Sequence, residues 1–103
     1  MKYFLIFSLL FSASVSADNL ELCNQVRDDS YSIMMYRQRS MDRDVQLKSL
    51  RGLAMNDVAT RLVIIMAYGE ESFQTGEYRE LASKRFAYKI FRDCLKNAKH
   101  YAR

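Results

Sequence analysis

Apolar positions recur every three to four residues along most of the chain, which is the period of an amphipathic helix. The pattern predicts a first helix over about 19–38, with Asp18 or Asn19 as its N-cap. Its inward face follows an i, i+4 spacing through Leu22, Val26, Ser30 and Ile33. The first predicted element is therefore a helix of five turns with one buried stripe.

Two further helices follow from capping residues and apolar spacing. One is predicted over about 42–51 and starts at Ser40 or Asp42. The other is predicted over about 76–99 and has Thr75 as its candidate N-cap. Its stripe has strict i, i+4 spacing and comprises Ala82, Phe86, Ile90, Cys94 and Ala98.

The most apolar stretch lies between these two helices. It predicts a helix over about 57–68, capped by Asn56 or Asp57 and ended by Gly69. We expect this helix to be the central element because it is apolar on all sides. Its expected buried stripe is Val58, Leu62, Ile65 and Met66, and Val63 and Ile64 widen that stripe. A buried strand over 62–67 is the alternative.

Turn-forming residues are scarce, with three Gly and no Pro in 103 residues. This argues against a β-sandwich or barrel, whose hairpins need such residues. We expect an all-α fold: a small bundle of about four helices whose first and last members, once the leader is removed, are antiparallel.

The N-terminal segment has the layout of a secretory signal. Lys2 precedes an apolar run from Tyr3 to Phe11, and small residues then lead to Ala17. We predict that residues 1–17 are removed, with a cut after Ala13 or an uncleaved anchor helix as the alternatives. Residues 18–103 are expected to form a single helical domain, exported to the periplasm or secreted. The run is too short to span a bilayer comfortably, so we expect no spanning segment after removal.

Two cysteines in an exported chain are expected to form one disulfide, Cys23–Cys94, with buried free thiols as the alternative. The bridge would close nearly the whole domain, and chain entropy puts its contribution at roughly 4.4 kcal/mol. No CxxC or zinc-ligand spacing is present, so neither a metal site nor a cofactor is expected.

Basic residues dominate the C-terminal segment, with seven Lys or Arg against one Asp from Lys84 onward. One explanation is complementarity to the helix dipole. The other is a free tail past the disulfide, which would bind an anionic surface or partner through Lys96, Lys99 and Arg103. The net charge of +4 is too modest for a nucleic-acid binder, so no nucleic acid is expected.

A second basic cluster surrounds the predicted corner between the first two helices. It comprises Tyr36, Arg37, Arg39, Arg43 and Arg51. Arg beside Tyr is common at protein interfaces, which makes the cluster a candidate binding surface. Asp42 and Asp44 are interleaved, so a corner held by weak Arg–Asp pairs is the alternative.

Catalytic patterns are thin. The single histidine, His100, lies near the C-terminus, and the adjacent acidic pairs do not form a dyad by spacing alone. We expect no catalytic residues and no enzymatic activity.

The layout resembles a group of small exported bacterial proteins of unknown function, often encoded near mobile elements. The matching features are Cys23, Ile33–Gln38, Ile64–Tyr68 and Phe86–Cys94. That group has a Gly soon after the Arg-Gln and a Pro soon after the Ala-Tyr, where this chain has Arg39-Ser40 and Gly69-Glu70. The resemblance implies a helical, one-disulfide envelope protein and supplies no activity.

Three functions fit these observations. The first is a periplasmic or secreted binding protein, with inhibitor or immunity factor as candidate roles and an unknown protein or anionic surface as partner. The second is a periplasmic stress chaperone, and the third is a subunit of an envelope assembly.

Overall fold

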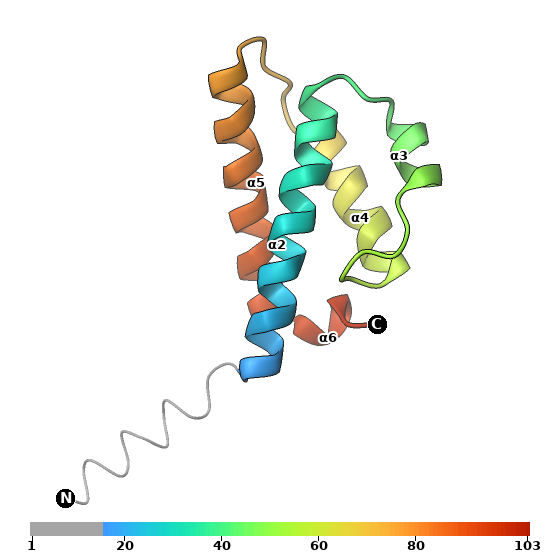
Figure 1. Cartoon of the computed structure of the whole chain (residues 1–103), viewed down its shortest axis with the longest axis vertical. Helices are drawn as coiled ribbons and strands as arrows, with labels where there is room; N and C mark the ends of the chain where they lie inside the picture. The colour runs from blue at the N-terminus through green and yellow to red at the C-terminus, as the bar shows by residue number, and fades with distance from the viewer. Residues whose placement is uncertain (1–15) are drawn as a thin grey trace, which may run out of the picture.

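Two long antiparallel helices form the centre of the computed structural model, which describes residues 16–103 (Figure 1). They are α2 (Ala17–Gln38) and α5 (Gly76–Lys96). The predicted disulfide joins them, with Cys23 near the start of α2 and Cys94 near the end of α5. The expected all-α bundle with an antiparallel, disulfide-linked pair is confirmed.

Three shorter helices complete the bundle: α3 (Arg43–Ser49), α4 (Asp57–Tyr68) and α6 (Ala98–Tyr101). Helix α4 packs against α2, and α3 packs against α4 on the side away from α5 (Figure 1). The described residues contain no strand, so the alternative of a strand over 62–67 is wrong.

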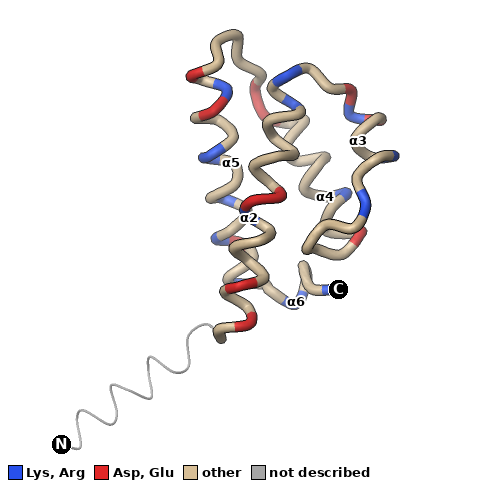
Figure 2. The backbone as a smooth tube through the Cα atoms, in the orientation of Figure 1, with Lys and Arg blue, Asp and Glu red and all other residues tan. Residues whose placement is uncertain are grey.

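Side-chain caps start α3, α4 and α5 where the sequence predicts them, whereas α2 is capped by Ser16 and not by Asp18 or Asn19. The Asp42 carboxylate accepts from the backbone N–H of Asp44, and Thr75 Oγ1 accepts from the N–H of Tyr78. Acidic residues lie near the start of α5 and basic residues recur along the rest of it (Figure 2), as the helix dipole favours.

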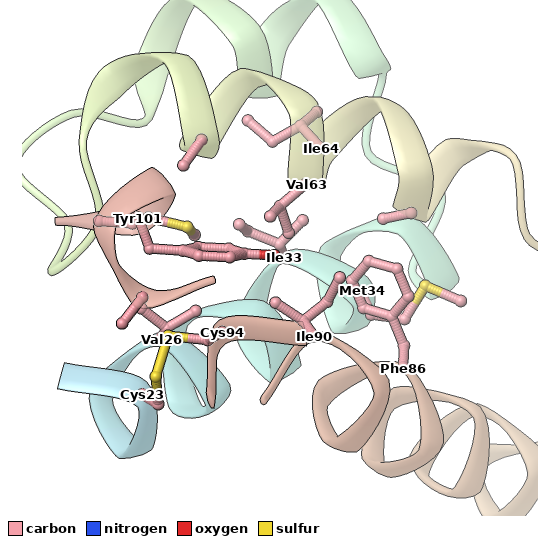
Figure 3. Close-up of a cluster of buried hydrophobic side chains, with 14 residues drawn as sticks. Cys23, Val26, Ile33, Met34, Val63, Ile64, Phe86, Ile90, Cys94 and Tyr101 are labelled. Atoms are coloured by element: carbon pink, nitrogen blue, oxygen red, sulfur yellow. A yellow bond between two sulfur atoms is a disulfide. The ribbon is translucent and has the colours of Figure 1, made fainter. Parts of the chain in front are cut away.

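The core lies between α2, α4 and α5 and is closed at one end by α6. Figure 3 shows Tyr101 of α6 beside Val26, Ile33 and Val63, in the space next to the disulfide. Phe86 and Ile90 bring α5 into the same cluster. The predicted inward stripes of α2 and α5 therefore meet as expected.

Both ends of the α2–α5 pair are closed, by different chemistry. At one end the two buried cysteines are bonded, with their Cα atoms 5.6 Å apart. At the other end the fully buried Gln38 amide donates to the carbonyl of Glu71 at 2.7 Å and accepts from the N–H of Phe73 at 2.8 Å. The α4–α5 loop is thus bonded to the end of α2.

The bounds 57–68 predicted for α4 are right, but its buried face is predicted only in part: Val63 and Ile64 are buried, whereas the main stripe is not. The four residues of its expected stripe point outward, with exposed fractions of 70%, 55%, 47% and 41% for Val58, Leu62, Ile65 and Met66. The opposite face is buried through Ala59, Thr60, Val63, Ile64 and Ala67. We call the exposed set (Val58, Leu62, Ile65, Met66) the outer row of α4.

The C-terminal segment is not a free overhang, which corrects a second expectation. The predicted helix over 76–99 ends at Lys96, and α6 turns back beneath the bundle. Ala98 and Tyr101 are buried there, with exposed fractions of 8% and 7%. The side chains of Lys96, Lys99 and Arg103 remain exposed.

The first helix begins earlier than predicted. It starts at Ala17, and Ser16 Oγ accepts from the N–H of Asn19 at 3.1 Å. The remaining residues of the predicted signal lie outside the described part of the chain. Within residues 16–103, every helix is too short or too polar to span a bilayer.

Candidate functional site

The predicted corner cluster is partly committed to holding the backbone. The half-buried Arg37 donates to the carbonyl of Glu70 at 3.2 Å and stacks over the Tyr68 ring at 5.3 Å. Arg51 donates to the carbonyls of Leu47 and Leu50 at the end of α3. These two arginines therefore serve the fold, whatever else they bind.

The other members of the corner cluster, Tyr36, Arg39 and Arg43, are exposed. Arg43 lies 3.8 Å from the Asp44 carboxylate, and both side chains are mostly in solvent, so the pair contributes little. Arg37 and Arg43 share an open hollow of about 480 Å³. Arg51 follows α3 at its far end, so the structure does not bring all five residues together.

A buried polar network lies beneath this corner. Gln46 Nε2 donates to the carbonyl of Ile33 at 3.2 Å and to Tyr68 Oη at 2.8 Å, and Tyr68 in turn donates to the carbonyl of Met41. Gln46 is fully buried. This network joins α2, α3 and α4 and explains why the corner carries polar residues that sequence patterning alone cannot assign.

The three predicted residues of the tail cluster separate in the structure. The Arg103 guanidinium donates to the carbonyl of Leu53 at 2.9 and 2.7 Å, whereas Lys99 lies on α6. Lys96 ends α5 and lines a groove described below. Helix α6, which carries Lys99, lies near the start of α2 (Figure 1), whereas Arg37 and Arg39 lie at its end.

Asn56 fastens the tail. Its side-chain oxygen caps α4 by accepting from the N–H of Ala59 at 2.8 Å, and its amide group donates to the carbonyls of His100 and Ala102. Its backbone N–H donates to the carbonyl of Tyr101 at 2.8 Å. One residue thus starts α4 and holds α6 beneath it.

Tyr101 is anchored by its hydroxyl, which donates to the Asp93 carboxylate. Burial, and then the hydrogen bond and the negative charge of Asp93, raise the pKa of the Tyr101 phenol above its usual value of 10.0. Asp93 also accepts from Asn97 Nδ2 at 3.3 Å. The carboxylate is therefore already hydrogen-bonded within the chain.

A groove of about 360 Å³ runs between α4 and α5. Its lining includes the apolar Met66 and Ile90, the aromatic Tyr88 and the acidic Asp93. The other four lining side chains are basic: Arg85, Lys89, Arg92 and Lys96. Met66 also belongs to the outer row of α4, so groove and row form one surface. We call this surface the α4–α5 surface.

The α4–α5 surface was not predicted from the sequence, because the residues of the outer row were expected in the core. One signal was available: Ala59, Val63 and Ala67 also follow an i, i+4 stripe, and small residues allow two helices to approach closely. The basic residues of α5 were interpreted either as a dipole effect or, for Lys96, as part of a free tail. Their spacing of 4, 3 and 4 residues places them along one edge of the helix.

Conventional catalytic constellations are not apparent among residues 16–103. No group of three or more His, Cys, Asp or Glu side chains there could hold a metal ion, and the exposed His100 lies on the short α6. The two cysteines are committed to the disulfide. The arrangement can offer recognition through shape, apolar contact and positive charge.

Comparison with known proteins gives no relative. No family model matches the chain, and neither the curated proteins nor the solved structures contain a match.

Proposed function

We propose that the chain is an exported, disulfide-locked binding protein without enzymatic activity, whose partner protein docks on the α4–α5 surface. Inhibitor and immunity factor are roles of this kind. The observation that carries the proposal is the outer row of α4, four large apolar side chains of which 41–70% is exposed. Such contiguous apolar surface marks interaction sites on small proteins.

The magnitude is adequate for a docking site. Full burial of a Val, Leu, Ile or Met side chain contributes about 1.5–3 kcal/mol. Because the fold has buried only part of each side chain, covering the outer row would contribute roughly 1 kcal/mol per residue. On α3, by contrast, Val45 is the one large apolar side chain that is exposed.

Export is supported by the leader pattern of residues 1–17 and by the use of both cysteines in a disulfide, which oxidising compartments favour. The bridge closes a loop with a sequence separation of 71 residues. It would keep a domain of this size folded outside the cell.

Site-specific photo-crosslinking in the native envelope tests the docking surface. A photoreactive residue at Leu62 should yield a defined adduct, and one at Val45, of similar exposure, should not. The adduct should disappear when Ile65→Ser is added. An adduct pattern that is the same from both positions, or no adduct from Leu62, would contradict the proposal.

A periplasmic stress chaperone is the second candidate, because an exposed apolar row also suits transient capture of unfolded clients. Suppression of client aggregation, lost in a Leu62→Ser/Ile65→Ser variant, would favour it. If the protein suppresses no aggregation at neutral or acid pH, this candidate is excluded.

A further inference from the structure

The basic side chains of the α4–α5 surface form one continuous stripe. Arg85, Lys89, Arg92 and Lys96 are spaced 4, 3 and 4 residues apart, which places them along one edge of α5 over three turns, or about 16 Å. All four are exposed. We call them the basic stripe.

The stripe borders an apolar floor. Ile90 is fully buried and lies in the lining of the groove, and Met66 of α4 lies across from it. Leu62 precedes Met66 by one turn and extends the apolar wall along α4. A ligand lying along the groove would therefore meet apolar atoms on one side and positive charge on the other.

The positive charge of the stripe is largely uncompensated within the described residues. Lys89 lies 3.9 Å from Glu70, and Arg92 stacks on the Tyr88 ring at 5.8 Å. Arg85 and Lys96 form no ion pair among residues 16–103. The one acid in the lining, Asp93, is hydrogen-bonded to Tyr101 and Asn97.

We propose that the α4–α5 surface binds an amphipathic helix of the partner protein that carries acidic residues along one edge. This inference rests on the proposed docking function and specifies the chemistry of the partner. The apolar side of that helix packs on Leu62, Met66 and Tyr88. Its carboxylates face the basic stripe over about three turns, a spacing that an α-helix reproduces.

Two other occupants fit the surface less well. In a two-fold dimer of this chain the same surface would meet itself, so the two basic stripes would face and repel each other. An anionic membrane presents a flat surface, which would meet the exposed stripe but leave the groove beside it unfilled.

Peptide binding tests the proposal. The probe is a labelled helical peptide with Leu along one face and Glu spaced 4, 3 and 4 residues along the adjoining edge. Fluorescence anisotropy should show saturable binding to the disulfide-intact protein, weakened by salt because the charges are exposed. A peptide with Lys in place of Glu should bind at least 10-fold more weakly.

Matched variants locate the site. Arg85→Glu/Lys96→Glu should weaken binding of the acidic peptide about 10-fold or more. Arg39→Glu/Lys48→Glu makes the same change in net charge away from the groove and should leave the affinity within about 2-fold. Circular dichroism of both variants checks that they are folded.

Several outcomes would overturn the proposal. They are equal binding of the Glu and Lys peptides, no saturable binding of the Glu peptide, or a larger loss from the control variant. Preferential binding to phosphatidylglycerol vesicles, or a dimer that Ile65→Ser dissociates, would assign the surface to lipid or to a second copy. If Leu62 crosslinks a partner but Arg85→Glu/Lys96→Glu leaves that adduct unchanged, the docking function stands and the acidic helix is wrong.

Discussion

Asn56 offers the sharpest test of how the bundle is closed, because one side chain performs two separable tasks. Its oxygen caps α4, and its amide nitrogen donates to two carbonyls of the C-terminal segment, at 3.0 Å for His100 and 2.9 Å for Ala102. Asn56→Ala removes both tasks. Asn56→Ser keeps a capping oxygen and removes only the bonds to the tail.

The expected losses follow from these contacts. Loss of an N-cap costs about 1 kcal/mol, and each hydrogen bond contributes about 0.5–1.5 kcal/mol, with the low end appropriate for the exposed bonds to the tail. Asn56→Ala should therefore lower the free energy of unfolding by about 2–3 kcal/mol. Asn56→Ser should lower it by about 1–2 kcal/mol.

Urea denaturation of the disulfide-intact protein, followed by circular dichroism, measures both values. Hydrogen exchange adds a local readout. The backbone N–H of residue 56, which donates to the carbonyl of Tyr101, should lose protection in both variants. If Asn56→Ser were as stable as the wild type, the bonds from Asn56 to the tail would contribute nothing to stability. In that case the tail is held by the buried Tyr101 ring alone.

Three other predictions use different parts of the fold. Replacing both Cys23 and Cys94 by Ser should lower the free energy of unfolding by up to about 4.4 kcal/mol, measured in urea, and a loss below 1 kcal/mol would contradict the assigned topology. Ile64→Ala should cost about 2–4 kcal/mol whereas Ile65→Ala should cost less than about 1, because their exposed fractions are 1% and 47%. The pKa of the Tyr101 phenol is raised in the folded state, so its contribution to stability is complete below pH 10 and is lost as the pH rises further. Tyr101→Phe should therefore flatten the fall of the urea midpoint with pH above pH 10. If the midpoint of the variant falls as steeply as that of the wild type, the raised pKa of Tyr101 is contradicted.

Local signals in the sequence were sufficient for most of the elements. The structure has caps at the predicted residues Asp42, Asn56 and Thr75, because a side-chain oxygen next to an amphipathic stretch is a local signal. The disulfide followed from the cysteine count and the export pattern. The caps depend only on neighbouring residues, and the disulfide depends on only two residues that are distant in the sequence.

Tertiary polar contacts could not be predicted in this way. Gln38 and Gln46 carry no sequence mark that distinguishes them from surface glutamines, yet both are fully buried and bonded to backbone that lies far away in the sequence. Ser40 is a related case, since its φ of 67° falls in the left-handed region that favours glycine. Two backbone hydrogen bonds close this turn, from the N–H of Ser40 to the carbonyl of Arg37 and from the N–H of Met41 to the carbonyl of Tyr36.

The orientation of α4 explains why the candidate site could not be predicted from the hydrophobic pattern of the sequence. A helix that is apolar on every side can satisfy a core with either face, so periodicity alone does not choose between them. The choice is steric: Ala59 and Ala67 let α4 lie close to α2, where Leu62 and Met66 would hold the two backbones apart. Because the small side chains pack against α2, the large ones, such as Leu62 and Met66, face outward. The surface we propose for docking thus follows from how α4 meets α2, and substitutions that enlarge Ala67 should disturb α4 packing and the groove together.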